Sequence, residues 1–274
     1  MSGLLRGQVA LVTGAGAGVG RGIALRFAEE GAAVAVHCRT SVSGAHDVAA
    51  RIRDMGSRAV VLQADLTVED ACARLVHDAA DWGGGRLTAL VNNAGVQPTQ
   101  DLSGMTAADF RAVFDANLSS VFACTQAAVE VMRATGGGSV THIASIEATH
   151  PAPLHAHYCA SKAAVVMHAR SAALEYGPQG IRVNTVSPGL IDREGLAEDW
   201  PEGCAAGAVP CPPAGWGAPR TSVTPVCSWP RRSPPGSPVT TWWWTAVCRP
   251  GPRGDGACGH DDLTHVRVGG SPPR

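Results

Sequence analysis

The chain of 274 residues, 45% of them hydrophobic, is long enough for one domain with a substantial core. Its formal net charge of −1 gives no case for binding nucleic acid or a membrane surface, and its apolar runs are too short to span a bilayer. Residues 1–7 lack the hydrophobic stretch of a signal peptide, and there is no Cys-x-x-Cys pair, so we expect a cytoplasmic protein with reduced thiols.

A strand, a glycine-rich turn and a helix are expected near the start of the chain. Residues 9–12 form an apolar run typical of a buried parallel strand. The turn that follows carries Gly14, Gly18 and Gly20, and residues 21–30 have the pattern of an amphipathic helix. Glycines let the backbone approach a pyrophosphate, and a helix N-terminus offers free N–H groups. This context predicts a dinucleotide-binding turn, with a plain flexible turn as the alternative.

A second strand is expected at residues 33–37, and it ends at Cys38. An acidic residue at this place would bind the adenosine ribose hydroxyls of NAD. Here Arg39, Thr40 and Ser41 follow instead, and a cation with two hydroxyl residues suits the additional phosphate of NADP. The sequence therefore favours NADP, with a solvated loop arginine as the alternative.

Strands and helices continue to alternate along the chain. Further strands are expected at 59–63, 87–91, 140–144 and 181–186, and further helices at 68–81, 107–133 and 158–176. The alternation predicts an α/β fold, a Rossmann-type doubly wound parallel sheet with helices on both faces. Ligands of such sheets bind at the carboxyl ends of the strands, and the polar motifs of this chain stand at those ends.

One motif combines a serine, a tyrosine and the only lysine of the chain. Ser145 follows the expected strand at 140–144, Tyr158 comes thirteen residues later, and Lys162 lies four residues after the tyrosine. In a helix, Tyr158 and Lys162 would lie one turn apart on one face. An ammonium near a phenol lowers the tyrosine pKa, which predicts a proton donor and acceptor that works near neutral pH. The alternative is an ordinary aromatic residue and an exposed lysine.

These motifs together resemble those of the short-chain dehydrogenase/reductase family, in order and spacing, over residues 5 to about 200. The matching residues are Thr13-Gly14-x-x-x-Gly18-x-Gly20, Asp65, Asn92-Asn93-Ala94-Gly95, Asn117, Ser145, Tyr158-x-x-x-Lys162 and Pro188-Gly189.

The resemblance implies a catalytic set of Asn117, Ser145, Tyr158 and Lys162. In it, Tyr158 is the general acid in reduction and the general base in oxidation, Lys162 lowers its pKa and binds the nicotinamide ribose, and Ser145 orients the substrate oxygen. Asn117 holds a water of a proton relay, although it could instead cap backbone groups, as Asp65 could cap the helix that follows it. The resemblance implies no metal. The implied cofactor-binding residues are Gly14, Gly18, Val19, Gly20, Arg39, Asp65, Leu66, Asn92, Ala94, Gly95, Tyr158, Lys162, Pro188, Gly189 and Ile191.

The segment 146–157 joins Ser145 to Tyr158 and should line the substrate pocket. With Glu147 after the serine and a Pro-x-Pro before the tyrosine, it resembles the same segment of sugar (glucose-type) dehydrogenases. The rest of the chain resembles β-ketoacyl-carrier-protein reductases equally well. We interpret the histidines of this segment as solvated loop residues rather than metal ligands.

The composition changes at about residue 204. Residues 204–274 hold 13 of the 19 prolines and five of the seven tryptophans, and they lack Ile, Phe, Tyr, Lys, Glu, Asn, Gln and Met. No apolar periodicity is present, so this segment predicts a disordered, irregular tail. We therefore expect residues 1–203 to form an NAD(P)-binding Rossmann domain with a built-in catalytic site, and residues 204–274 to be foreign to the family.

The genetic code offers a cause for this change. Residues 242–247, Trp-Trp-Trp-Thr-Ala-Val, require TGG TGG TGG ACN GCN GTN, which reads NTG GTG GTG GAC NGC NGT from one base earlier. That frame is compatible with Leu-Val-Val-Asp-Gly-Gly, which the resemblance implies for the last strand of the family. We therefore predict a one-base frameshift near Gly203, with a genuine novel tail as the alternative, and expect the chain as written to be poorly soluble or inactive.

The sequence thus predicts an NADP-preferring oxidoreductase that interconverts a carbonyl and a secondary alcohol of a small molecule. A sugar dehydrogenase that uses NAD or NADP is one alternative. A catalytically dead dinucleotide-binding remnant is another. Intact relatives are commonly homo-oligomers, but the elements with which they associate are those that the tail replaces.

Overall fold

The computed structural model describes residues 3–189 and 241–243. These residues form a seven-stranded sheet in the order β3-β2-β1-β4-β5-β6-β7, in which every neighbouring pair is parallel. The strands are β1 Val9–Val12, β2 Ala33–Cys38, β3 Ala59–Gln63, β4 Ala89–Asn92, β5 Gly138–Ile143, β6 Ile181–Ser187 and β7 Thr241–Trp243. The predicted parallel, Rossmann-type sheet is confirmed.

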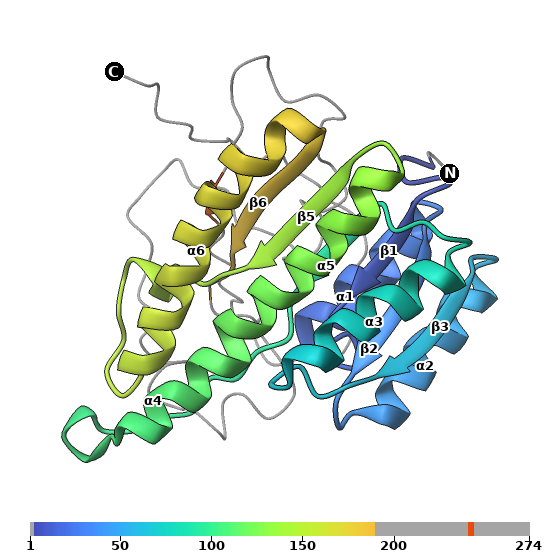
Figure 1. The fold of residues 1–274 in the computed structure, drawn as a ribbon. Coiled ribbons are helices and arrows are strands. Elements are labelled where there is room, and N and C mark those ends of the chain that lie inside the picture. The colour runs from blue at the N-terminus through green and yellow to red at the C-terminus, as the bar shows by residue number, and fades with distance from the viewer. Residues whose placement is uncertain (1–2, 190–240, 244–274) are drawn as a thin grey trace, which may run out of the picture.

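Helices cover both faces of this sheet (Figure 1). They are α1 Gly18–Glu29, α2 Val42–Asp54, α3 Glu69–Trp82, α4 Ala107–Phe114, α5 Ser120–Ala134 and α6 Ala156–Tyr176. Helices α1 and α2 pack on one face through residues such as Ile23 and Ile52. Helices α3, α5 and α6 pack on the other through residues such as Val76, Met132 and Ala169. The strands bury both faces, which is why they read as continuous apolar runs in the sequence.

Two helical features differ from the sequence expectation. The segment between β2 and β3, for which no helix was expected, forms α2. The helix expected at 107–133 is interrupted by a turn of π-helix at Asp115–Ser119, which separates α4 from α5. Such a turn contains one more residue than the α-helical repeat and is frequent at functional sites. Among the described residues, no helix is long and apolar enough to cross a membrane.

Strand β7 lies within the segment that the sequence assigns to an irregular tail. It pairs with the end of β6, Thr185 being opposite Thr241 and Ser187 opposite Trp243. The outer edge of β6 presents backbone groups that a further strand can pair with, and threonine and tryptophan favour extended backbone. The remaining residues of that segment lie outside the described part of the chain.

Candidate active site

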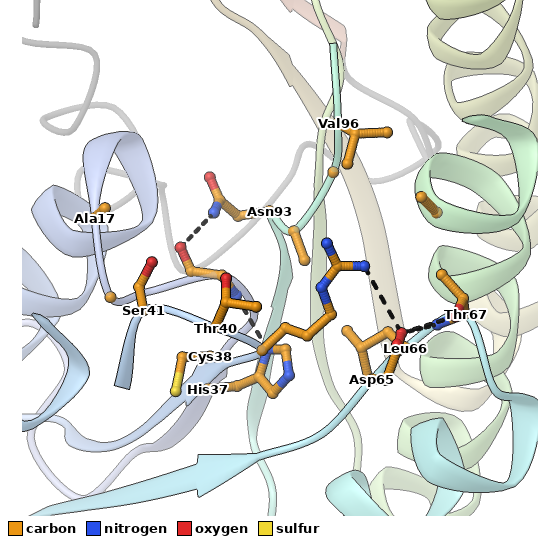
Figure 2. A pocket seen from close by; sticks show the side chains of 16 residues that line it. Ala17, His37, Cys38, Thr40, Ser41, Asp65, Leu66, Thr67, Asn93 and Val96 are labelled. Carbon is orange, nitrogen blue, oxygen red and sulfur yellow. Dashed lines mark hydrogen bonds and ion pairs between the residues drawn. The ribbon is translucent and has the colours of Figure 1, made fainter. Parts of the chain in front are cut away.

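A cleft with a volume of about 240 Å³ opens at the carboxyl ends of β1 to β4. Its walls are the glycine turn after β1, residues 37–41 at the end of β2 and just beyond it, residues 65–67 after β3 and residues 93–96 after β4 (Figure 2). It lies where the strand order reverses between β1 and β4, which is where open α/β sheets bind their ligands.

The glycine turn is packed so closely at Gly14 and Gly20 that a side chain is excluded at these two positions. Gly14 has a φ of +64°, and a Cβ atom added there would lie 2.9 Å from Cα of Ala94. A Cβ atom added at Gly20 would overlap the carbonyl oxygen of Gly14. Asn93 fixes the turn from the side of β4, because its Nδ2 donates to the carbonyl oxygens of Thr13 (2.9 Å) and Gly14 (3.1 Å).

Helix α1 begins at the end of this turn and suits an anion. Its first turn contains no acidic residue, and its N-cap, Ala17, makes no side-chain hydrogen bond to the backbone. The N–H groups at this end therefore lack a side-chain cap, and the helix dipole is positive there. The residues present thus fit the pyrophosphate of a dinucleotide.

Arg39 and Asp65 face each other at the mouth of the cleft, with 4.0 Å between the guanidinium nitrogen and Oδ1, and both are about half exposed. Oδ1 of Asp65 also accepts the backbone N–H of Thr67 at 3.0 Å and its hydroxyl at 2.8 Å. These hydrogen bonds, with a smaller contribution from Arg39, hold the pKa of Asp65 below its usual value. Asp65 therefore orders the turn at 65–67; helix α3 begins later, at Glu69.

Tyr158 and Lys162 lie one turn apart near the start of α6, and both are buried, with 9% and 5% of their surface exposed. Nζ of Lys162 is 5.7 Å from the centre of the Tyr158 ring and donates to the carbonyl oxygen of Ile143 at 2.8 Å. Oγ of Ser145, just after β5, accepts the backbone N–H of Glu147 at 3.1 Å. Its own hydroxyl proton can still be donated to a ligand.

The pKa of Tyr158 differs from the sequence expectation. Burial is the main cause that raises it to about 12, while the Ser145 hydroxyl lowers it and Glu147 raises it further. Burial also lowers the pKa of Lys162 to about 8. The expected fall in the tyrosine pKa is therefore not found in this structure, because burial disfavours the charged phenolate.

Asn117 lies in the turn of π-helix and is fully buried. Its Oδ1 accepts the N–H of Val96 at 2.8 Å, and its Nδ2 donates to the carbonyl oxygen of Val96 at 2.9 Å and to Oγ of Ser161 at 3.1 Å. Its side chain therefore binds backbone groups, which was the alternative role considered for it. Its role as the holder of a relay water stays a prediction.

Gly95 lies between the cleft and two of the predicted catalytic residues. It lines the cleft, and a Cβ atom added there would lie 2.9 Å from Oδ1 of Asn117 and 3.6 Å from Nζ of Lys162. Asn117 and Lys162, two of the predicted catalytic residues, thus lie beside Gly95, and Tyr158 is next to Lys162.

The segment between Ser145 and Tyr158 carries a partly buried acidic group. Oε2 of Glu147 lies 3.0 Å from Nδ1 of His155, and its Oε1 accepts from Nε2 of Gln97 at 2.9 Å. The His155 ring stands edge-on to that of Tyr158, with 6.0 Å between their centres. Leu154, just before this histidine, has a φ of +66°, an unfavourable value for a branched side chain.

The predicted cofactor residues lie in several places, and only some of them line the cleft. Gly14, Arg39, Asp65, Leu66, Ala94 and Gly95 line the cleft. Gly18, Val19 and Gly20 form the first turn of α1, while Pro188 is buried and accepts the N–H of Ile146 at 3.0 Å, beside Gly189. Asn92 points away from the cleft, since its Nδ2 donates to Thr125 and His142. Ile191 lies outside the described residues.

Sequence reasoning missed two residues of the cleft. Asn93 was expected only as part of a supporting turn, yet its side chain is the one that fixes the glycine turn. His37 was seen only as a strand residue, yet its imidazole reaches the same turn. A polar residue at the penultimate position of a buried apolar strand was the available signal, because such a group requires a hydrogen-bond partner.

Comparison with known proteins identifies relatives of this chain. The short chain dehydrogenase family matches residues 8–203. A cis-4-hydroxycyclohexanecarboxylate dehydrogenase from Sinomonas cyclohexanicum is 40% identical over 186 residues, which are 68% of this chain and 74% of that protein.

Solved structures of dehydrogenases are also similar to this chain. A short chain dehydrogenase from Burkholderia cenocepacia in complex with NADP has a TM-score of 0.70 and 34% identity, covering 75% of this chain and 84% of that one. A 7α-hydroxysteroid dehydrogenase complexed with NADH and 7-oxo glycochenodeoxycholic acid has a TM-score of 0.68 and 34% identity, covering 72% of this chain and 76% of that one.

Proposed function

The chain belongs to the short chain dehydrogenase family, and from this membership we propose that it interconverts a secondary alcohol and a carbonyl with NADP as its preferred cofactor. As a family member it is an oxidoreductase that acts on the hydroxyl or carbonyl group of a small molecule. In this proposal the bound cofactor supplies or accepts the hydride. The protein positions the reactants and moves the proton.

Tyr158 is the proton donor and acceptor of the proposed mechanism. In the reductive direction its hydroxyl gives a proton to the carbonyl oxygen, which becomes the alcohol, and the phenolate remains. In the oxidative direction the phenolate takes the proton back. The Ser145 hydroxyl donates a hydrogen bond to the same substrate oxygen, and the Lys162 ammonium stabilises the phenolate.

One observation carries this proposal. Gly95 forms part of the cleft wall, and Asn117 and Lys162 lie beside it, which supports a place for the Tyr158–Lys162 pair next to the space that a dinucleotide would fill. Proton transfer and hydride transfer require such proximity, because both act on the same carbon–oxygen group.

The preference for NADP rests on the residues after β2. Arg39 is a cation that lines the cleft, and Thr40 and Ser41 line the wall next to it (Figure 2). A guanidinium and two hydroxyl groups suit a phosphate ester on the adenosine ribose.

Replacing Tyr158 by phenylalanine tests the mechanism. We expect Tyr158→Phe to lower kcat by roughly two to four orders of magnitude, because the ring stays but the transferable proton is lost. The dissociation constant of NADPH should stay within about two-fold, since the cleft walls are unchanged. Turnover is followed by NADPH absorbance with a panel of ketones, β-ketoacyl thioesters and sugars.

Tyr176, the only other tyrosine of the chain, provides the matched control at the end of the same helix. Tyr176→Phe should leave both constants unchanged. A Tyr158→Phe protein as active as the parent would refute the assigned mechanism. NADPH binding by the parent without turnover of any substrate class would favour a remnant that binds a dinucleotide and catalyses nothing.

A further inference from the structure

His37 is a fully buried residue near the end of β2, with 1% of its surface exposed. Its Nδ1 accepts the backbone N–H of Gly14 at 3.1 Å, and its Nε2 lies 3.1 Å from the carbonyl oxygen of Ala64. The backbone carbonyl of His37 accepts the N–H of Ala15 at 2.7 Å. One residue thus reaches both the glycine turn and the residue that precedes Asp65.

These partners determine the state of the imidazole. A backbone N–H can only donate, so Nδ1 must be the unprotonated nitrogen, and the carbonyl of Ala64 requires the proton on Nε2. Both contacts therefore exist together only in the neutral ring. Burial, which lowers the pKa of His37, favours the same form, although the hydrogen bond to Ala64 works against this effect.

Gly14 is held on both sides by this arrangement. Its N–H is bound by His37, and its carbonyl oxygen is bound by Nδ2 of Asn93 at 3.1 Å. Its φ of +64° and its close approach to Ala94 leave it little room for another position. Figure 2 shows His37, from the wall at the end of β2, and Asn93, from the wall after β4, on different sides of the turn.

We propose that His37 is a positioning residue of the cofactor site, whose neutral imidazole holds the glycine turn in the geometry that receives the phosphates of a dinucleotide. The proposal rests on the proposed function, because it presumes that a dinucleotide binds in this cleft. A turn that is ordered before the ligand arrives loses less conformational freedom on binding. His37 does not need to touch the cofactor for this effect, since it acts through Gly14.

Two conservative variants separate the contacts of the ring. In His37→Asn the amide oxygen can stand near the position of Nδ1 and still accept from Gly14. In His37→Gln the amide nitrogen can stand near the position of Nε2 and still donate to Ala64, while the N–H of Gly14 loses its acceptor. His37→Phe removes both contacts.

We expect the dissociation constant of NADPH, measured by fluorescence titration, to rise about ten-fold in His37→Gln and His37→Phe and to stay within about three-fold in His37→Asn, because a buried donor is left unpaired only in the first two. At saturating cofactor, kcat should stay within about two-fold of the parent in all variants, since the hydrogen bonds of His37 go to Gly14, Ala15 and Ala64 and not to the proposed reacting groups. His46→Asn and His46→Gln, on the exposed side of α2, should change neither constant.

The assignment is overturned if His37→Asn binds as weakly as His37→Gln, or if every variant binds like the parent. A larger loss in His37→Asn than in His37→Gln would also overturn it, because the contact with Ala64 would then be the important one. If His37→Phe does not fold, the Asn and Gln variants still decide. A parent protein that binds no dinucleotide would reject the proposed function as well, whereas a parent that binds equally to its variants rejects the role of His37 alone.

Discussion

In our proposal, Arg39 is the residue that favours NADP over NAD. Its guanidinium is about half exposed and lies 4.0 Å from the Asp65 carboxylate, a distance at which an exposed ion pair contributes little stability. The side chain therefore remains able to turn towards a phosphate, which can accept two hydrogen bonds from its planar donors.

Arg39→Ala should raise the dissociation constant of NADPH by about ten-fold, because a charge-assisted hydrogen bond to the phosphate is lost. The constant for NADH should stay within about two-fold. Titrating both cofactors against the variant and against Arg51→Ala, an exposed control on α2, separates these effects. An equal rise in the dissociation constants of NADPH and NADH would mean that Arg39 does not bind the additional phosphate of NADPH.

Residues of the site could be predicted where a motif fixes their spacing in the sequence. The direction in which an individual side chain points could not be predicted. The sequence places Tyr158, Lys162 and Ser145 together because helix and strand geometry carry them there. It cannot distinguish Asn92 from Asn93, since neighbouring residues at the end of a strand point to opposite faces. Asn92 is the one that turns towards α5.

A buried polar row crosses three neighbouring strands beneath α5 and α6. The strand register places Asn92 of β4 opposite His142 of β5, and His142 opposite Thr185 of β6. Thr125 of α5 donates its hydroxyl to a backbone carbonyl and so accepts from Nδ2 of Asn92, which also donates to Nδ1 of His142. The ring of His168 on α6 lies 5.3 Å from that of His142.

This row should make the sheet sensitive to acid. Burial, with smaller contributions from His168 and Lys162, lowers the pKa of His142 to about 3. The folded-state pKa is below the unfolded value, so the stability that the neutral ring contributes is complete above about pH 6.5 and is lost as the pH falls towards 3. Between pH 6.5 and 5 the loss from this group should be about 2 kcal/mol of unfolding free energy.

Urea unfolding of the parent and of His142→Asn at these two pH values measures the effect. The variant keeps an acceptor for Asn92 but does not titrate, so its unfolding free energy should fall less than that of the parent. His77→Asn, on the exposed side of α3, is the control for a histidine in solvent. Parallel pH dependence in parent and His142→Asn would contradict the prediction.

At the level of elements, the alternation of apolar runs and helical patterns was enough to predict six strands and the parallel sheet. Helix α2 was missed although its buried residues, Ala45, Val48, Ala49 and Ile52, recur at helical spacing. Two of the four are alanines, so the apolar stripe in VSGAHDVAARIRD is weak, and the segment also contains a glycine. The π-helical turn at Asp115–Ser119 could not be predicted, because residues 107–133 fit one continuous apolar pattern. The π-helical turn contains Asn117, whose side chain binds the backbone of Val96. This contact joins segments that are distant in the sequence, so the helical pattern alone does not indicate it.

The division of the whole chain at about residue 203 remains our proposal, as does the frameshift. Strand β7 falls at Thr241–Trp243, and the predicted alternative frame places the last strand of the family at the codons of residues 242–247. The same stretch of chain would thus serve as the edge of the sheet in either frame, with a different sequence.

We predict that the gene has a one-base insertion or deletion near the codon of Gly203. Sequencing the gene across this point decides the question, and an intact frame there would reject the hypothesis. A chain with the frame restored should give more soluble protein and a higher unfolding temperature by circular dichroism, because C-terminal residues with the family's apolar pattern would again pack against the sheet. Equal solubility and cooperative unfolding of the two chains would count against it.

The reversal of strand order divides the molecule into two halves, and the cleft lies on the seam between them. Strands β1 and β4 join the halves through the pairs Ala10–Ala89, Leu11–Leu90 and Val12–Val91, and α3 packs on α5 across the same boundary. The cleft takes its walls from both halves, so a molecule bound there contacts both of them. Its binding free energy therefore adds to the unfolding free energy of the protein, and a substitution that weakens the contact between the halves should lower both ligand affinity and stability.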